Sequence, residues 1–440
     1  MTWHNWAGTA SADPARRYWP RSTEEIADAV KDAAAGGLTV RALGGGHSFT
    51  PAAATSGAAL DLSGWTGIVG ADLSSGLITA RSGTTIRELN RALDSLGLAM
   101  PNLGDIDAQT ISGAISTGTH GTGAGLGGIA TQVAALELVL ADGSVVTCSA
   151  EQRQDLFNAA RVSIGALGVI STVTLQCVPA FTLAAHEAPM HVDQVLARFD
   201  EFAAVNDHFE FYWFPYGGNA LLKQNNRTAA TGDGPGRPGE IPPPMPGWRK
   251  FLEYEVMENA AFGALCRTGR AMPRLIKPLN RLASATLSTR RYSAPSHEVF
   301  VTPRRVRFVE SEYAVPRESV HEVLAQLRAG VPRLAHPVMF PVEIRVAAAD
   351  DIWLSTAYGR DSAYVAIHQY VGLPYQEYFR LFESIAAGVG GRPHWGKMHT
   401  RDAGYLTDVY PRFADFLKIR DETDPDRRFA NPYLDQVFGS

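Results

Sequence analysis

The feature that most constrains the fold is a run rich in glycine, serine and threonine, PNLGDIDAQTISGAISTGTHGTGAGLGG, from Pro101 to Gly128. With so few bulky side chains, its backbone can approach another backbone or a ligand closely. A second tract, Gly44 to Gly46, directly precedes His47. Bare backbone amides can cradle a pyrophosphate, so the two tracts together predict one extended ligand. For either tract alone, a simple turn is an equally good interpretation.

A literal G-x-G-x-x-G match at Gly123, Gly125 and Gly128 is rejected as a dinucleotide-binding fingerprint. It precedes a predicted strand and follows none, whereas that fingerprint requires a strand before it and a helix after it. The surrounding chain predicts short strands, a hairpin turning at Asp142-Gly143, and isolated helices rather than regular β-α-β repeats. The predicted fold class is therefore α+β.

Two capping-box patterns support this fold class. Ser22 with Glu25 precedes IADAVKDAAA, and Thr85 with Glu88 precedes IRELNRALDSLGL, so each pair predicts the start of a helix.

Beyond Pro179 the pattern changes to longer predicted strands, FEFYWFPY, RFVESEYAVP, FPVEIRVAA and AYVAIHQYVG, with one helix, ESVHEVLAQLRAG, between two of them. This predicts one larger sheet with helical cover, and a domain boundary near residue 179. The Pro/Gly-rich stretch from Thr231 to Gly247 predicts a surface loop. FADFLKIRDETDPDRRFANPYL near the end predicts a helix followed by turns.

The length of 440 residues favours two packed units, and 45% hydrophobic with 19% charged residues is a globular composition. Forty basic and forty-five acidic residues include no run of like charge, which makes nucleic acid an unexpected partner. Three widely spaced cysteines suggest neither a disulfide framework nor a CxxC site. We expect no signal peptide and no membrane span, and a cytoplasmic location.

The strand FPVEIRVAA places Val342, Ile344 and Val346 on one face and Glu343 with Arg345 on the other. Over a cleft, the guanidinium could stabilise a developing oxygen charge while the carboxylate orients it. On a solvated face the two would form an ordinary surface ion pair, which the pattern alone favours slightly.

Histidines and one lysine are further candidates. AYVAIHQYVG places Tyr364, Ala366, His368 and Tyr370 on one face, where His368 suits either a ligand site or the interior equally. The segment RPHWGKMHT clusters His394, Trp395, Lys397 and His399 without the partners of a zinc site, so no metal is predicted there. Its lysine is better suited to an anionic oxygen. Considered alone, His47 is most simply a turn residue.

Five motifs in order, RALGGGHSF, PNLGDIDAQTISGAISTGTHGTG, GALGVI, FPVEIR and RPHWGK, resemble the aldonolactone oxidase branch of the vanillyl-alcohol-oxidase (VAO) flavoprotein family. The resemblance covers nearly the whole chain and includes gulonolactone and arabinonolactone oxidases and dehydrogenases, close to alditol oxidases. It implies a two-domain VAO/PCMH-type fold. Residues 1–178 would form the FAD-binding domain, 179–398 a substrate (cap) domain with a large antiparallel sheet, and 399–440 a segment returning to the FAD domain.

The resemblance also assigns residues. It implies that His47 is bonded covalently to FAD and that Glu343, Arg345, Lys397, Asp105 and His368 are catalytic or substrate-site residues. The implied cofactor-binding residues are Arg41, Gly44, Gly45, Gly46, His47, Ser48, Phe49, Asn102, Gly104, Thr110, Ser112, Gly113, Ser116, Thr117, Gly118, His120, Gly121, Gly168, Val169, Ile170, His394 and Lys397.

The expected reaction is oxidation of an aldono-1,4-lactone by hydride transfer to FAD. Relatives that act on open-chain polyols resemble this chain but carry Ser where it has Asp105, which favours a lactone over a polyol such as xylitol or sorbitol. Alditol oxidation stays the alternative. Gly104 lies where the family gates oxygen, so O2 is the expected acceptor, with another acceptor also possible.

Overall fold

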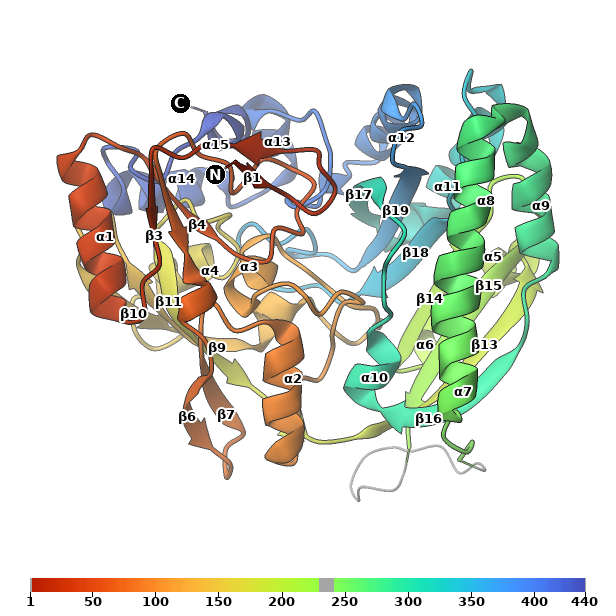
Figure 1. The fold of residues 1–440 in the computed structure, drawn as a ribbon, viewed down its shortest axis with the longest axis horizontal. Helices are drawn as coiled ribbons and strands as arrows, with labels where there is room; N and C mark the ends of the chain where they lie inside the picture. Colours follow the sequence, from red (N-terminus) through yellow and green to blue (C-terminus); the bar gives the residue numbers. More distant parts are fainter. Residues whose placement is uncertain (1, 229–240, 440) are drawn as a thin grey trace.

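The computed structural model describes residues 2–228 and 241–439, and Figure 1 shows two lobes side by side, with both chain ends on the first lobe. The first lobe holds a five-stranded sheet of order β10-β9-β11-β7-β6 and a parallel sheet of order β3-β5-β4. These strands are β3 (Arg16–Tyr18), β4 (Val40–Leu43), β5 (Ala58–Asp61), β6 (Ile68–Asp72), β7 (Leu77–Arg81), β9 (Val133–Val139), β10 (Val145–Ser149) and β11 (Val169–Gln176). Two small pairs add β1 (Trp3–His4) with β2 (Ser11–Ala12), and β8 (Leu98–Ala99) with β12 (Val178–Pro179).

Two helices of the first lobe, α1 (Thr23–Ala35) and α2 (Ile86–Ser95), begin where the capping patterns predict. The lobe also contains α3 (Ile111–Ser116) and α4 (Gln154–Ala160), which no capping pattern predicted. The box at Thr85 and Glu88 is complete. The one before α1 is half formed, because Ser22 accepts the Glu25 amide while the Glu25 carboxylate accepts the Arg21 amide instead. The predicted hairpin between β9 and β10 is confirmed.

The second lobe is built on one eight-stranded antiparallel sheet of order β16-β13-β15-β14-β18-β19-β17-β20. Its strands are β13 (Thr182–His191), β14 (His208–Trp213), β15 (Asn219–Arg227), β16 (Arg290–Pro295), β17 (Phe308–Pro316), β18 (Val342–Ala347), β19 (Ser362–Tyr370) and β20 (Arg392–Pro393). The large sheet expected from the sequence is therefore present.

Because successive side chains of a strand point to opposite faces, one face of this sheet is apolar and the other is charged and polar. The outer face packs apolar side chains such as Phe211, Ile344 and Val365 against helices α5, α6, α11 and α12. The opposite face, here called the inner face, turns charged and polar side chains toward the first lobe.

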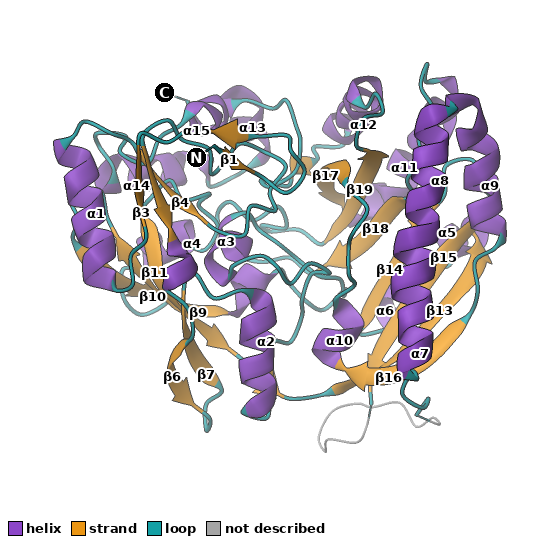
Figure 2. Ribbon diagram, in the orientation of Figure 1, coloured by secondary structure: helices purple, strands orange, loops and turns teal. Residues whose placement is uncertain are grey.

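The helix predicted between two of the long strands is confirmed as α11 (Val320–Gly330). The lobe also contains helices that were not predicted, namely α5 (Val192–Ala197), α6 (Phe199–Val205), α7 (Gly247–Lys250), α8 (Phe262–Ala271), α9 (Ile276–Ala285), α10 (Ser296–Phe300) and α12 (Gln376–Gly388). A π-helical stretch, Phe251–Ala261, joins α7 to α8 into the long helix in front of the sheet in Figure 2. Exposed apolar residues such as Trp248 and Phe251 blur its helical periodicity, which explains the miss.

Most of the predicted loop from Thr231 to Gly247 lies outside the described residues, and Gly247 begins α7. The last helices are α13 (Ala403–Val409), α14 (Phe413–Thr423) and α15 (Pro432–Phe438). They share one hydrophobic core with α2 and α3 of the first lobe, and Trp395 belongs to the same core. Among the described residues, no helix combines the length and apolar composition that crossing a membrane requires.

Candidate active site

A cavity of about 820 Å³ lies between the inner face of the sheet and the loops of the first lobe. The five predicted catalytic residues all line it: Asp105, Glu343, Arg345, His368 and Lys397. A narrower cavity of about 110 Å³ adjoins it. Both linings include His47, Ser48, Gln109 and Thr117. The two spaces therefore meet at His47.

Most of the predicted cofactor-binding residues line one of these cavities. The narrow one is lined by Arg41, Gly44, Gly45, Gly46, His47, Ser48, Thr110, Ser112, Gly113, Ser116, Thr117, Gly168, Val169 and Ile170. The large one is also lined by Phe49, Gly104, His120 and His394. Three predicted residues, Asn102, Gly118 and Gly121, line neither. Asn102 and Gly121 pack together, since a Cβ on Gly121 would lie 2.3 Å from Asn102 Oδ1.

The glycine tract fits a pyrophosphate-bearing cofactor. A Cβ on Gly45 would lie 2.3 Å from the Ala108 carbonyl oxygen, and Gly46 has a φ of +68°, so neither position tolerates a side chain. The amides of Gly45, Gly46 and His47 donate to no acceptor among residues 2–228 and 241–439. Arg41, by contrast, donates to the carbonyls of Ile164, Gly165 and Phe429. The free amides could hold the pyrophosphate of FAD, with its ring system in the large cavity.

His47 stands in the wall between the two cavities. The ring of Trp6 stacks on it, with centroids 5.8 Å apart and planes 25° from parallel. Burial lowers the pKa of His47, and the positive charge of Lys397 lowers it further. The imidazole is therefore neutral at neutral pH, with a lone pair available for bonding. The stacking residue Trp6 was not found from the sequence.

Arg345 is held among carboxylates on the inner face. Its Nη2 lies 2.5 Å from Glu343 Oε1, and its Nε lies 2.9 Å from Glu210 Oε2 on the neighbouring strand β14. Tyr212 donates its hydroxyl to Glu343 Oε1 at 3.0 Å. Burial opposes the charge of Arg345, yet these carboxylates outweigh it and raise its pKa well above the usual value. The predicted Glu343 and Arg345 pair is thus in the cavity wall and not on a solvated surface.

Lys397 and His368 share a carboxylate that the sequence analysis missed. Lys397 Nζ lies 2.5 Å from Glu310 Oε2, and His368 Nε2 lies 3.4 Å from Glu310 Oε1. The other nitrogen of His368, Nδ1, lies 3.2 Å from the Pro341 carbonyl. Burial opposes protonation of His368, but Glu310 and Glu343 outweigh it and raise its pKa. The Lys397 pKa is raised likewise against burial, mainly by Glu310.

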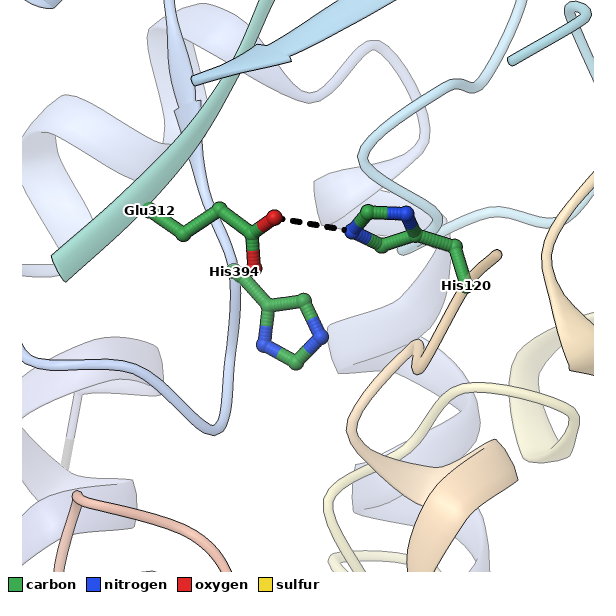
Figure 3. Close-up of side chains that lie close together, drawn as sticks. All are labelled: His120, Glu312 and His394. Atoms are coloured by element: carbon green, nitrogen blue, oxygen red, sulfur yellow. Dashed lines mark hydrogen bonds and ion pairs between the residues drawn. The ribbon is translucent and has the colours of Figure 1, made fainter. Parts of the chain in front are cut away.

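His120, Glu312 and His394 lie together beside the large cavity (Figure 3), with ligand-type atoms all within 4.8 Å of one another. His120 Nδ1 faces the Gly121 carbonyl at 2.8 Å, and Nε2 faces Glu312 Oε1 at 3.0 Å. The ring therefore bridges the Gly121 backbone and the Glu312 carboxylate. Burial opposes ionisation of Glu312, but His120 outweighs it and lowers the Glu312 pKa.

The same cluster does not fit a metal ion. His394 Nδ1 accepts the Gly396 amide at 3.0 Å, which places the ring proton on Nε2 and leaves that nitrogen without a lone pair for a metal. Burial lowers the His394 pKa to about 3, so the ring is neutral. The cluster is a hydrogen-bonded connection between the lobes, with Tyr364 stacked on His120 at 3.5 Å between centroids.

Two members of the RPHWGKMHT cluster point elsewhere. Trp395 is fully buried and donates its indole N–H to the Leu354 carbonyl. His399 Nε2 lies 2.9 Å from the Tyr433 hydroxyl on α15. The same segment still shapes the site, because the Phe49 amide donates to the Gly396 carbonyl at 2.7 Å. This hydrogen bond places Lys397 beside the glycine tract that carries His47.

The main residues that the sequence analysis missed are Glu210, Tyr212, Arg304, Glu310 and Glu312. Four of them had a usable signal. FEFYWFPY and RFVESEYAVP were predicted as strands, and polar side chains two residues apart in a strand share one face. Arg304, in a loop after α10, had none.

Residues 14–149 match the profile of an FAD binding domain, and residues 173–437 match that of the D-arabinono-1,4-lactone oxidase family. The chain is 43% identical to an L-gulono-1,4-lactone dehydrogenase of Mycobacterium tuberculosis, over 99% of each chain. It is 35% identical to the L-gulonolactone oxidase of Mus musculus (100% of this chain, 98% of the relative). An alditol oxidase of a Streptomyces species is 30% identical (98% and 97%).

Among solved structures, a solvent-stable cholesterol oxidase superposes with a TM-score of 0.82 at 20% identity, covering 100% of this chain and 97% of that one. The cholesterol oxidase of B. sterolicum gives 0.81 at 16% identity, covering 99% and 96%. These likenesses concern the fold alone, which is the two-lobed flavoprotein fold expected from the sequence. The profile match and the full-length identities place this chain in the D-arabinono-1,4-lactone oxidase family of FAD-dependent oxidoreductases.

Proposed function

We propose that this protein uses FAD to oxidise an aldono-1,4-lactone, such as L-gulono-, L-galactono- or D-arabinono-1,4-lactone, to an ascorbate-type product. One observation carries the proposal. Arg345 of the inner face and Lys397 of the Arg392–Lys397 segment line the same cavity as His47. A substrate hydroxyl placed there would meet two fixed cations beside the cofactor ring.

Bound FAD supplies the acceptor for the hydride that leaves the substrate carbon. The side chains stabilise the negative charge that develops on the substrate oxygen and accept the proton of its hydroxyl. Arg345 and Lys397 donate hydrogen bonds to the substrate oxygen as negative charge develops on it. Glu343 Oε2 accepts the hydroxyl proton, and its raised pKa makes it a stronger base than an ordinary carboxylate. Burial is the largest cause of the raised pKa of Glu343. The negative charges of Asp105 and Glu210 raise this pKa further, and the positive charge of Arg345 opposes the rise.

We further propose that the flavin is bonded to His47, supported by its neutral imidazole in the shared wall of the two cavities. Oxygen is the proposed acceptor, since Gly104 leaves the wall of the large cavity without a side chain. A cytoplasmic location is supported by three buried cysteines, Cys148, Cys177 and Cys266, each without a disulfide partner.

A substrate panel tests this function. The purified holoenzyme is given gulono-, galactono- and arabinono-1,4-lactone, xylitol and sorbitol, each with oxygen and with a dye acceptor. We expect a lactone to be the fastest substrate in both assays. Faster turnover of either polyol would replace the proposal by alditol oxidation, which the 30% identical Streptomyces relative makes the second candidate.

A further inference from the structure

Asp105 is held by the second lobe although it belongs to a loop of the first. Arg304 Nη2 lies 2.5 Å from Asp105 Oδ2, and the Thr302 amide donates to the Asp105 carbonyl oxygen at 3.3 Å. On the other side, Arg345 Nη2 lies 3.8 Å from Asp105 Oδ1. Backbone and side chain are therefore both fixed from across the cavity.

This ion pair is open to the cavity, unlike most others in the wall. The side chains of Asp105 and Arg304 are 23% and 32% exposed, against 8% for Glu343 and 10% for Arg345. Both line the large cavity. An ionised carboxylate has about four acceptor sites, and Arg304 occupies one of them at hydrogen-bond distance. The remaining sites can accept hydrogen bonds from a ligand that carries several hydroxyls.

We propose that Arg304 is a positioning residue for substrate selection, which holds Asp105 ionised and oriented to accept hydrogen bonds from the hydroxyls of a sugar lactone remote from the reacting carbon. The inference rests on the proposed function and extends it to the part of the substrate that is not oxidised.

Arg345 cannot replace Arg304 in this role. Its guanidinium is already engaged by Glu343 and Glu210, and its contact with Asp105 is the longest of the three. Without Arg304, the Asp105 carboxylate would keep only the longer contact with Arg345 and no partner at hydrogen-bond distance. Its orientation would then be lost, while Arg345 and Lys397 would still stand where the oxidised hydroxyl binds.

The test compares two substrates in the holoenzyme of the wild type, Arg304→Met and Arg304→Lys. L-gulono-1,4-lactone carries the remote hydroxyls, whereas α-hydroxy-γ-butyrolactone keeps only the lactone and the reacting hydroxyl. We expect Arg304→Met to raise KM for gulonolactone by roughly thirtyfold or more while kcat changes little. KM for the short lactone should stay within about twofold, because it makes none of the affected hydrogen bonds. Arg304→Lys should recover part of the loss.

Arg305→Met is the matched control, since Arg305 is adjacent, 65% exposed and paired with Glu255 at 2.6 Å. Equal KM changes for the two lactones, or none for gulonolactone, would refute the role of Arg304. If Arg304→Met binds no flavin, Arg304→Gln is tested instead with the same expectation and the same refuting outcomes. A wild type that oxidises neither lactone would overturn the proposed function, a result distinct from any change seen only in the variants.

Discussion

Lys397 Nζ lies 2.5 Å from Glu310 Oε2, and this ion pair ties the Arg392–Lys397 segment to β17. Glu312, two residues along the same strand, pairs with His120 of the first lobe. One strand of the second lobe thus orients the candidate catalytic lysine and also contacts the glycine-rich segment of the first lobe. We infer that the position of Lys397 depends on how the lobes pack, as well as on its own segment.

Replacing Lys397 with Ala should slow anaerobic reduction of the flavin by lactone on the order of a hundredfold, because one donor to the developing oxygen charge is lost. The flavin content should stay normal. Stopped-flow absorbance measures the reduction, and the exposed Lys418→Ala provides the control. Reduction at the wild-type rate would show that Lys397 does not act on the substrate.

His47→Ala should yield protein whose flavin is released by acid, whereas the wild-type flavin should remain with the precipitated protein. The reason is the neutral, cavity-lining imidazole of His47. Absorbance of the acid supernatant measures the released flavin, and His4→Ala, at an exposed position, is the control. Release of flavin from the wild type would show that the flavin is not bonded covalently to His47, but it would not contradict the proposed cofactor site.

Two buried histidines, His208 and His394, and the half-buried His399 should make the fold sensitive to acid. Burial lowers the pKa of His208 and His399 to about 4 and that of His394 to about 3. The pKa of each of these histidines in the folded protein lies below the value near 6.5 in the unfolded chain. The folded state therefore keeps its full stability above about pH 6.5 and loses stability as the pH falls below it. At pH 5 the loss is about 2 kcal/mol for each histidine.

Thermal unfolding of the His208→Gln variant tests the direction of this pH dependence of stability. Between pH 7 and pH 5 its Tm should fall less than the wild-type Tm, because one of the groups that must remain neutral is gone. The exposed His336→Gln should follow the wild type. An unchanged or steeper fall in His208→Gln would mean that another group controls the acid response.

Gly104→Ala should slow reoxidation of the reduced flavin by oxygen more than reoxidation by a dye. The new Cβ would lie 3.1 Å from the His120 carbonyl oxygen and 3.3 Å from Thr119 Cγ2, in the wall of the large cavity. Gly125→Ala is the control, because its Cβ would meet nothing within 4 Å. Equal slowing with both acceptors would indicate a distorted loop instead of restricted oxygen access.

Much of the local structure could be predicted because its signals are local. The Thr85 and Glu88 capping box and the alternation that puts Glu343 beside Arg345 each need only a few neighbouring residues. The pairing of Arg345 with Glu210 depends instead on the order of the strands in the sheet. Two strands distant in sequence become neighbours there, and no spacing in the chain specifies it.

Interactions between the lobes could not be predicted from the sequence for the same reason. Arg304 meets Asp105 across 199 positions of the chain, and His120 meets Glu312 across 192. The long helix around Phe251–Ala261 was missed for another reason. Its partly exposed apolar residues give no clear stripe, so its helical state depends on its position over the sheet.

The most direct test is an anaerobic titration of the purified yellow holoenzyme with L-gulono-, L-galactono- and D-arabinono-1,4-lactone, followed by the visible flavin absorbance. We expect at least one lactone to bleach the flavin fully at one equivalent per flavin, and the colour to return on admitting oxygen or a dye. A flavin that stays oxidised with all three lactones would contradict it.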